Sequence, residues 1–244
     1  MSPSNMLHGL AITALAAVAA TATPVNAQSV NVYSSRHYDS DDVLYDAFTE
    51  KTGITVNRIE GGADELIARL DAEGDNSPAD VFMAVDVGRM ARAEEAGVLQ
   101  PFDSEVIEAR IPPHLRHPDD LWFGISQRAR IVFYAKDRVD TPPRTYEELA
   151  DPKWDDTICV RSSSNIYNQS LLASIIEVHG EEAARDWAAG IVENMARAPQ
   201  GGDTDQLRGL VSGECDLAIS NHYYFLRGFD TDVSGLSEDI DSIG

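Results

Sequence analysis

Apolar and polar positions alternate along the chain in a regular order of short strand-like and longer helix-like segments. Strand-like segments are rich in β-branched and aromatic residues, and helix-like segments carry apolar residues three or four positions apart. In the first part of the chain the pattern predicts strands at 29–33, 54–59 and 80–85, and helices at 41–51, 64–73 and 88–96. This order predicts a parallel sheet with helices on both of its faces.

The same alternation returns in the second part of the chain. A strand at 131–135 leaves the first unit, and Pro142 and Pro143 precede a segment, Thr145–Leu149, that is predicted to open a helix. Further strands are predicted at 157–161 and 215–220, and further helices at 168–179, 181–196 and 203–212. The predicted fold class is therefore α/β with two lobes, at 28–127 and 128–228, which cross over near 127–134. A cleft between two lobes commonly holds a small ligand.

The N-terminal segment has the pattern of a signal peptide. Residues 1–27 contain no Asp, Glu, Lys or Arg, and an apolar run at 10–20 precedes the small-residue pattern Val25-Asn26-Ala27. We expect cleavage after Ala27 and an exported, periplasmic protein. No later apolar run approaches the length that crosses a membrane.

Charge and cysteine content narrow the function classes. The net charge of −22 would repel a polyanion, so no nucleic-acid partner is expected. The two cysteines, Cys159 and Cys215, lie in apolar strand-like runs. Export permits a disulfide between them, and two buried free thiols are an equal alternative. The sequence contains no HExxH, GxSxG, P-loop or GxGxxG motif, so no enzyme activity is expected.

Phenol and imidazole side chains follow several predicted strands, at the edge where a parallel sheet usually binds its ligand. Taken singly, each of these residues is more typical of ordinary packing or of a loop. As a set they place one His and four Tyr at the carboxyl ends of strands in both lobes, with the last two tyrosines in a predicted loop. The candidate donors are His37, Tyr38, Tyr167, Tyr223 and Tyr224.

A donor set built from phenols favours a hard, strongly acidic cation. A phenol titrates near pH 10, so it binds at neutral pH only to an ion that can displace its proton. Zinc prefers Cys, His and carboxylate ligands, and calcium and magnesium prefer carboxylates, carbonyls and water. Fe³⁺ fits phenolate oxygens better. Four phenolates would leave an excess negative charge, which a nearby arginine such as Arg128 could offset directly or through a bound anion such as carbonate.

Several stretches resemble the ferric-iron-binding proteins of bacterial ABC importers, in particular their tyrosine-rich branch. They are VYSSRHY, ADVFMAVDVGRMARAEEAGVLQPF, YEELADPKWDDTICVRSSSNIYNQSLLAS, PQGGDTDQL and CDLAISNHYYF. The resemblance implies a two-lobed periplasmic-binding-protein fold of type II. It also implies a monomer that delivers Fe³⁺ to an inner-membrane permease and its ATPase.

The resemblance also implies roles for individual residues. His37 and Tyr38 match ligands from the first lobe, and Tyr167 and the pair Tyr223 and Tyr224 match ligands from the second. Arg128 matches an arginine near the metal that can contact a bound anion. Members of this family differ in whether the histidine binds and in whether carbonate is used.

The C-terminal segment departs from the family pattern. Relatives continue beyond the tyrosine pair, whereas residues 229–244 form a short acidic tail, so the C-terminal part of the fold is expected to be truncated. Such a shortening would expose apolar surface on both lobes. Two alternatives remain open: the same fold binding an oxyanion or a small organic cation, and a secreted metalloenzyme built from the same residues.

Overall fold

A computed structural model describes residues 28–36, 38–228, 236 and 239–244. The predicted signal peptide and the candidate ligand His37 lie outside the described residues. Within the part of the chain that the structure describes, no helix is long and apolar enough to cross a membrane.

The first lobe is built on a parallel three-stranded sheet with the order β2-β1-β3. Tyr33 at the centre pairs with Ile59 on one side and Phe82 on the other, so the prediction of a parallel sheet is confirmed. The strands are β1 (Ser29–Ser34), β2 (Thr55–Glu60) and β3 (Val81–Met83), and the principal helices are α1 (Asp39–Thr52), α2 (Ala63–Glu73) and α3 (Val87–Glu95).

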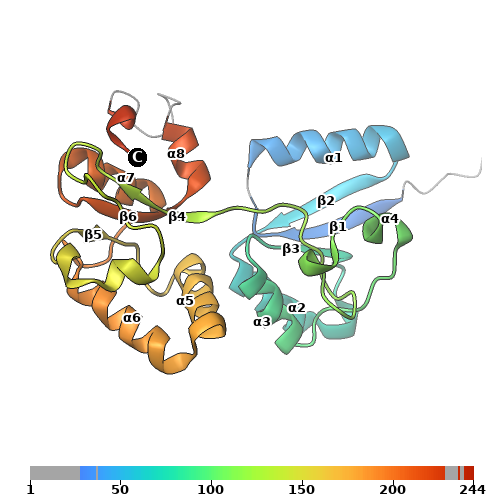
Figure 1. The fold of residues 1–244 in the computed structure, drawn as a ribbon. Helices are drawn as coiled ribbons and strands as arrows, with labels where there is room; N and C mark the ends of the chain where they lie inside the picture. The colour runs from blue at the N-terminus through green and yellow to red at the C-terminus, as the bar shows by residue number, and fades with distance from the viewer. Residues whose placement is uncertain (1–27, 37, 229–235, 237–238) are drawn as a thin grey trace, which may run out of the picture.

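Shorter helices complete this lobe: η1 (Gly74–Asn76), α4 (Glu105–Glu108) and η2 (Pro113–Leu115). Helix α1 lies on one side of the sheet, and α2 and α3 lie on the other (Figure 1). The core contains Tyr33, Leu66 and Leu70, which are buried between β1 and α2. Leu66 and Leu70, four positions apart in the helix predicted at 64–73, therefore both face the core.

The second lobe has a mixed sheet with the order β4-β6-β5. Strands β5 and β6 are parallel, and β4 runs antiparallel to β6. The strands are β4 (Arg130–Tyr134), β5 (Ile158–Cys159) and β6 (Leu217–Asn221). The helices are η3 (Glu147–Ala150), η4 (Pro152–Trp154), α5 (Ile166–His179), α6 (Glu181–Glu193), α7 (Asp203–Ser212), α8 (His222–Gly228) and η5 (Ile240–Ser242).

The two lobes lie side by side, and the chain passes from the first to the second just before β4 (Figure 1). In the second lobe α5 and α6 lie on one side of the sheet, and α7 and α8 lie on the other (Figure 1). The carboxyl ends of β5 and β6 therefore point toward α5 and α8, which begin close to the first lobe.

Three local expectations differ from the structure. The segment that was expected to open a helix at 145–149 forms a single 3-10 turn, η3, which the buried side chain of Leu149 anchors. The strand expected at 157–161 is only two residues long. Ile176 occupies an apolar position of the helix predicted at 168–179, but it is 38% exposed, whereas Leu171 and Ile175 are buried.

The apolar face of α1 is exposed to solvent. Val43 and Leu44 are 68% and 66% exposed, and Phe48 is 41% exposed. The helical spacing predicted from the sequence is correct, but the described residues do not cover this face.

The end of the acidic C-terminal segment packs into the second lobe. Leu236, Ile240 and Ile243 are buried in the core cluster that also contains Phe133. Gly244 exchanges two backbone hydrogen bonds with Tyr134 in β4. The described apolar side chains of the acidic tail are therefore part of the second-lobe core.

The two cysteines form a disulfide. Cys159 at the end of β5 is bonded to Cys215, which precedes β6, with 5.8 Å between their Cα atoms. Both side chains are buried, and Gly209 of α7 packs directly over the two sulfur atoms. Of the two alternatives left open by the sequence, the structure contains the disulfide.

Candidate functional site

Each of the four candidate tyrosines lies at or near the beginning of a helix. Tyr38 is the N-cap residue of α1, and Tyr167 is the second residue of α5, whose N-cap Asn165 accepts a hydrogen bond from the Tyr167 backbone N–H. Tyr223 and Tyr224 lie in the first turn of α8. The prediction that this pair lies in a loop is therefore wrong. The helical turn lets both rings leave the same end of β6, where a continuing strand would point them to opposite faces.

The structure brings these four tyrosines together from both lobes. The hydroxyl oxygens of Tyr167 and Tyr223 are 3.4 Å apart. The rings of Tyr223 and Tyr224 lie with their centroids 4.4 Å apart. Tyr38 of the first lobe lies close enough to Tyr223 of the second for the Tyr223 hydroxyl to influence the pKa of Tyr38. The grouping expected from strand ends is thus realised at the lobe interface.

The surroundings of the four phenols lower the pKa of one of them and raise the pKa of the other three. Burial, followed by the hydrogen bond and charge of Tyr223, raises the pKa of Tyr167 and the pKa of Tyr224. Burial and Tyr223 also raise the pKa of Tyr38. For Tyr223, burial acts to raise the pKa, but the neighbouring hydroxyls of Tyr167 and Tyr224 and the charge of Arg128 outweigh it, so its pKa is lowered. Tyr223 is therefore the first of the four phenols to lose its proton as the pH rises.

Three guanidinium groups surround the ring of Tyr167. The Cζ atoms of Arg128, Arg161 and Arg130 lie 4.7, 5.4 and 5.8 Å from its centroid. Cations over an aromatic face are held by the negative ring quadrupole, and they also stabilise a nearby phenolate. Arg128 contributes to the lowered pKa of Tyr223 in this way. The sequence identified Arg128 as a charge-compensating residue, and the structure places it beside the tyrosines.

Two carboxylates that the sequence did not single out hold these arginines. Asp86 accepts a hydrogen bond from Arg128, which also donates to the Val85 carbonyl oxygen. Asp203 is fully buried and forms ion pairs with Arg130 at 2.9 Å and Arg161 at 3.1 Å. Asp86 and Asp203 lie at the starts of α3 and α7, where aspartate is common. The sequence alone therefore gave no sign that each of them also binds an arginine of the cluster.

Histidine contributes to the surroundings of the cluster through a residue that the sequence did not identify. The ring of His222 lies edge-on to the ring of Tyr223, with 6.0 Å between centroids. Its Nδ1 atom lies 3.0 Å from the backbone nitrogen of Ala129, in the crossover between lobes.

Among the described residues there is no group of three or more His, Cys, Asp or Glu side chains that could hold a metal ion. The candidate donors described here are phenols.

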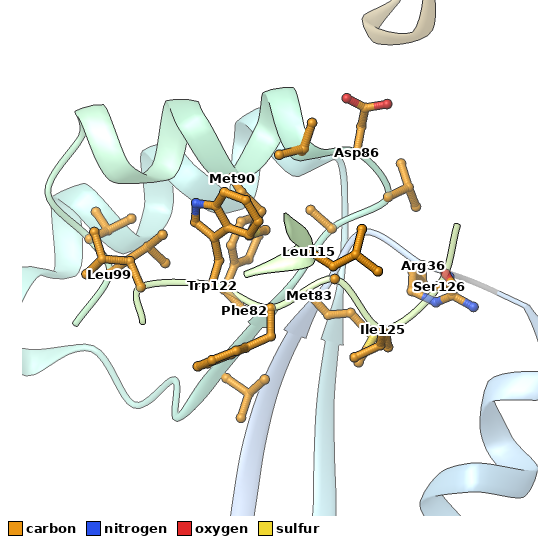
Figure 2. A pocket seen from close by; sticks show the side chains of 18 of the residues that line it. Arg36, Phe82, Met83, Asp86, Met90, Leu99, Leu115, Trp122, Ile125 and Ser126 are labelled. Atoms are coloured by element: carbon orange, nitrogen blue, oxygen red, sulfur yellow. The ribbon is translucent and has the colours of Figure 1, made fainter. Parts of the chain in front are cut away.

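A cavity of about 1790 Å³ opens from the tyrosine cluster along the first lobe. Figure 2 shows its wall, in which Met90, Leu99 and Trp122 form an apolar part and Asp86 and Arg36 lie away from them. At its other end the cavity is lined by Tyr38, Tyr167, Tyr223 and Arg128. These three tyrosines are therefore accessible from the space between the lobes.

Comparison with known proteins finds two iron uptake proteins among the similar sequences. Iron uptake protein A1 of Synechocystis is 53% identical over 206 residues, which cover 84% of this chain and 57% of that protein. Iron uptake protein A2 of the same organism is 52% identical over 222 residues, covering 90% of this chain and 62% of that protein. The chain thus spans about three fifths of the length of these relatives.

Solved structures show the same fold. The structure of a Trichodesmium protein, described as IdiA or FutA in complex with iron and citrate ligands, matches with a TM-score of 0.84 and 51% identity. The match covers 88% of this chain and 69% of that one. The architecture is therefore that of a two-lobed periplasmic ferric-binding protein.

A profile of the bacterial extracellular solute-binding protein family matches residues 76–226. Together with the shared fold, this match shows that the chain belongs to the bacterial extracellular solute-binding protein family.

Proposed function

We propose that this protein captures Fe³⁺ between its two lobes, with phenolate oxygens as the principal ligands. The observation that carries the proposal is the convergence of four phenols from different elements at one point of the lobe interface. The proposed ligands are Tyr38, Tyr167, Tyr223 and Tyr224. Relatives described as iron uptake proteins and as ferric iron-binding proteins support this assignment.

The electrostatics of the cluster favour a trivalent cation. Three of the four phenols have a raised pKa, so they stay protonated at neutral pH in the absence of a metal. Fe³⁺ is acidic enough to displace these protons, and binding then releases protons to solvent. Because divalent ions polarise a phenol less, they compete poorly for such a site.

Charge compensation comes chiefly from arginine. Four phenolates around Fe³⁺ carry one negative charge in excess, and Arg128 lies over the ring of Tyr167 to offset it. Arg128 already donates to Asp86 and to the Val85 carbonyl oxygen. A synergistic anion such as carbonate would therefore compete with Asp86 for this guanidinium, and His37 is the other candidate to complete the shell.

The family supports a transport role for the loaded protein. We propose that it acts in the periplasm as a monomer, with residues 1–27 removed, and that it hands Fe³⁺ to an inner-membrane ABC permease without catalysing a reaction. Closure of the lobes at 28–127 and 128–228 would hold Tyr38 of the first lobe against the second-lobe phenols, by a hinge motion of the kind that two-lobed binding proteins use.

Titration of the purified protein with ferric citrate tests the proposal. A phenolate bound to Fe³⁺ donates electron density to the metal and gives a visible charge-transfer band. The wild-type protein is expected to develop this band in proportion to bound iron. A variant with both Tyr223→Phe and Tyr224→Phe is expected to lose most of it.

A matched change away from the cluster separates ligand loss from loss of structure. Tyr45 lies in α1, where its hydroxyl donates to the sulfur of Met83 at 3.5 Å. Tyr45→Phe should therefore leave the band unchanged. A folded wild-type protein that stays colourless with ferric citrate, or binds phosphate in preference to it, would refute the assignment.

A further inference from the structure

Beyond the tyrosines, one buried carboxylate connects the elements that carry them. Asp203 is the first residue of α7, and its side chain is fully buried. A buried carboxylate without partners is strongly unfavourable, so the ion pairs and hydrogen bonds of Asp203 must offset the cost of burying it. The start of a helix adds a favourable interaction with the helix dipole.

Three donors converge on this carboxylate from three separate segments. Arg130 of β4 donates to its Oδ2 at 2.9 Å, and Arg161, which follows β5, donates to its Oδ1 at 3.1 Å. The backbone N–H of Asn221, the last residue of β6, donates to Oδ2 at 2.9 Å. Asp203 thus ties together the ends of all three strands of the second-lobe sheet.

The same donors also contact the segments that position the phenols. The guanidinium groups of Arg130 and Arg161 lie over the ring of Tyr167. Arg130 also donates to Asn168 of α5 at 2.7 Å. Asn221 is followed directly by the turn of α8 that holds the tyrosine pair.

We propose that Asp203 is the positioning residue of the second-lobe phenols. It holds Arg130 and Arg161 against Tyr167, and through Asn221 it fixes the start of α8. The role of Asp203 in iron binding rests on the proposed ferric function, whereas its role in ordering the tyrosines does not. Partners that orient metal ligands in this way commonly contribute 10- to 100-fold to metal affinity.

The test compares Asp203→Asn with Asp205→Asn in the purified protein. Asp205 lies in the same first turn of α7, where its side chain accepts from the Gly202 backbone N–H at 2.7 Å and from Arg208. It makes none of the contacts of Asp203 with Arg130, Arg161 or Asn221. The two variants therefore remove the same charge from the same turn, and only one removes the link to the tyrosines.

Two readouts are measured. The first is the near-ultraviolet circular dichroism of the protein without iron, which reports aromatic side chains held in one arrangement. Asp203→Asn is expected to lose part of this signal while far-ultraviolet dichroism is unchanged. The second is ferric titration, in which Asp203→Asn should bind about 10- to 100-fold more weakly and shift the charge-transfer band. Asp205→Asn should match the wild type in both.

Each of the two measurements tests a different part of the proposal. A colourless wild-type protein would refute the ferric function, and the dichroism would still decide whether Asp203 orders the phenols. If Asp203→Asn does not fold, Arg161→Lys keeps the positive charge but loses the planar fork, and a smaller change in the same direction is expected. Unchanged dichroism and affinity in the folded variant, or equal changes in Asp205→Asn, would overturn the proposal.

Discussion

The hydroxyl of Ser170 in α5 donates to Asp86 Oδ1 at 2.6 Å and joins the second lobe to the first. Asp86 also caps α3 through the Gly88 backbone N–H at 2.9 Å and binds Arg128 of the crossover. One carboxylate therefore links both lobes and the segment between them, close to Tyr167. A neighbouring contact, from Arg92 to Gln169 at 2.7 Å, supports the same interface.

Removing the hydroxyl of Ser170 should shift the lobes toward an open arrangement. A hydrogen bond to a charged group contributes about 1.5–3 kcal/mol, so Ser170→Ala should weaken lobe closure by up to that amount. Small-angle X-ray scattering of the iron-free protein should then show a larger radius of gyration. Ser174→Ala is the control, because that hydroxyl donates within its own helix to the Leu171 carbonyl oxygen at 2.6 Å. Equal expansion in both variants would contradict a latch at Ser170.

Alkaline pH should destabilise the protein through its buried phenols. The pKa of Tyr224 is raised above its ordinary value of 10.0, chiefly by burial. The folded state then keeps a proton that the unfolded chain has lost, so this stabilisation is full below about pH 10 and is lost as the pH rises further. Tyr38 and Tyr167 act with the same sign, and Tyr223, whose pKa is lowered, acts with the opposite sign.

Urea unfolding at a series of pH values measures this effect. Between about pH 9 and about pH 11 the free energy of unfolding of the wild type should fall more steeply than that of Tyr224→Phe. Tyr45→Phe, which lies outside the cluster, should follow the wild type. Parallel curves for all three proteins would show that the buried phenols do not govern alkaline stability.

Loss of the disulfide should cost substantial stability without removing the site. Cys159 and Cys215 are 56 residues apart in the sequence, so their bond restricts the unfolded chain over a long loop. A bridge of this kind typically contributes about 2–4 kcal/mol. Cys159→Ala with Cys215→Ala should lower the free energy of unfolding by this amount in urea titrations. A reducing agent should lower wild-type stability similarly and leave the double variant unaffected.

The exposed face of α1 should tolerate the shortening of an apolar side chain. Leu44 is 66% exposed whereas Leu66 of α2 is 4% exposed, although both occupy apolar positions of amphipathic helices. Leu44→Ala should change the free energy of unfolding by less than about 0.5 kcal/mol. Leu66→Ala should cost about 2–5 kcal/mol, because it leaves a cavity beside Tyr33. Similar costs for both changes, measured by urea unfolding, would show that the face of α1 is covered in solution.

Much of the fold could be predicted from periodicity and helix-end signals. Helix α7 has the predicted bounds of 203–212, and it ends at Gly213, whose φ of 76° suits glycine. The parallel sheet of the first lobe follows from alternating strands and helices, because two parallel strands need a crossover between them. Predictions failed where local pattern competes with packing, as at 145–149, where a helical pattern yields a single 3-10 turn.

At the C-terminus the average composition of the segment does not show which of its side chains are buried. Residues 229–244 are acidic on average, yet the few apolar side chains among them, Leu236, Ile240 and Ile243, are buried against the second lobe. Burial depends on which surface a side chain meets and not on the average polarity of its segment. Helix α1 is the opposite case: its apolar residues have the spacing of a buried face, but no described residue covers them.

The sequence by itself determined which residue types follow the strands, and therefore that phenols from both lobes could meet. Tertiary structure decided that they do meet: Tyr38 reaches Tyr223, and Tyr223 lies 3.4 Å from Tyr167 across 56 residues of sequence. The tertiary structure also shows that Asp203 and Arg161 are partners of the cluster, which the sequence could not distinguish from its many other acidic and basic residues. The physical reason is that coordination and pKa depend on distances of a few ångströms between side chains, and only the packing of the elements sets those distances.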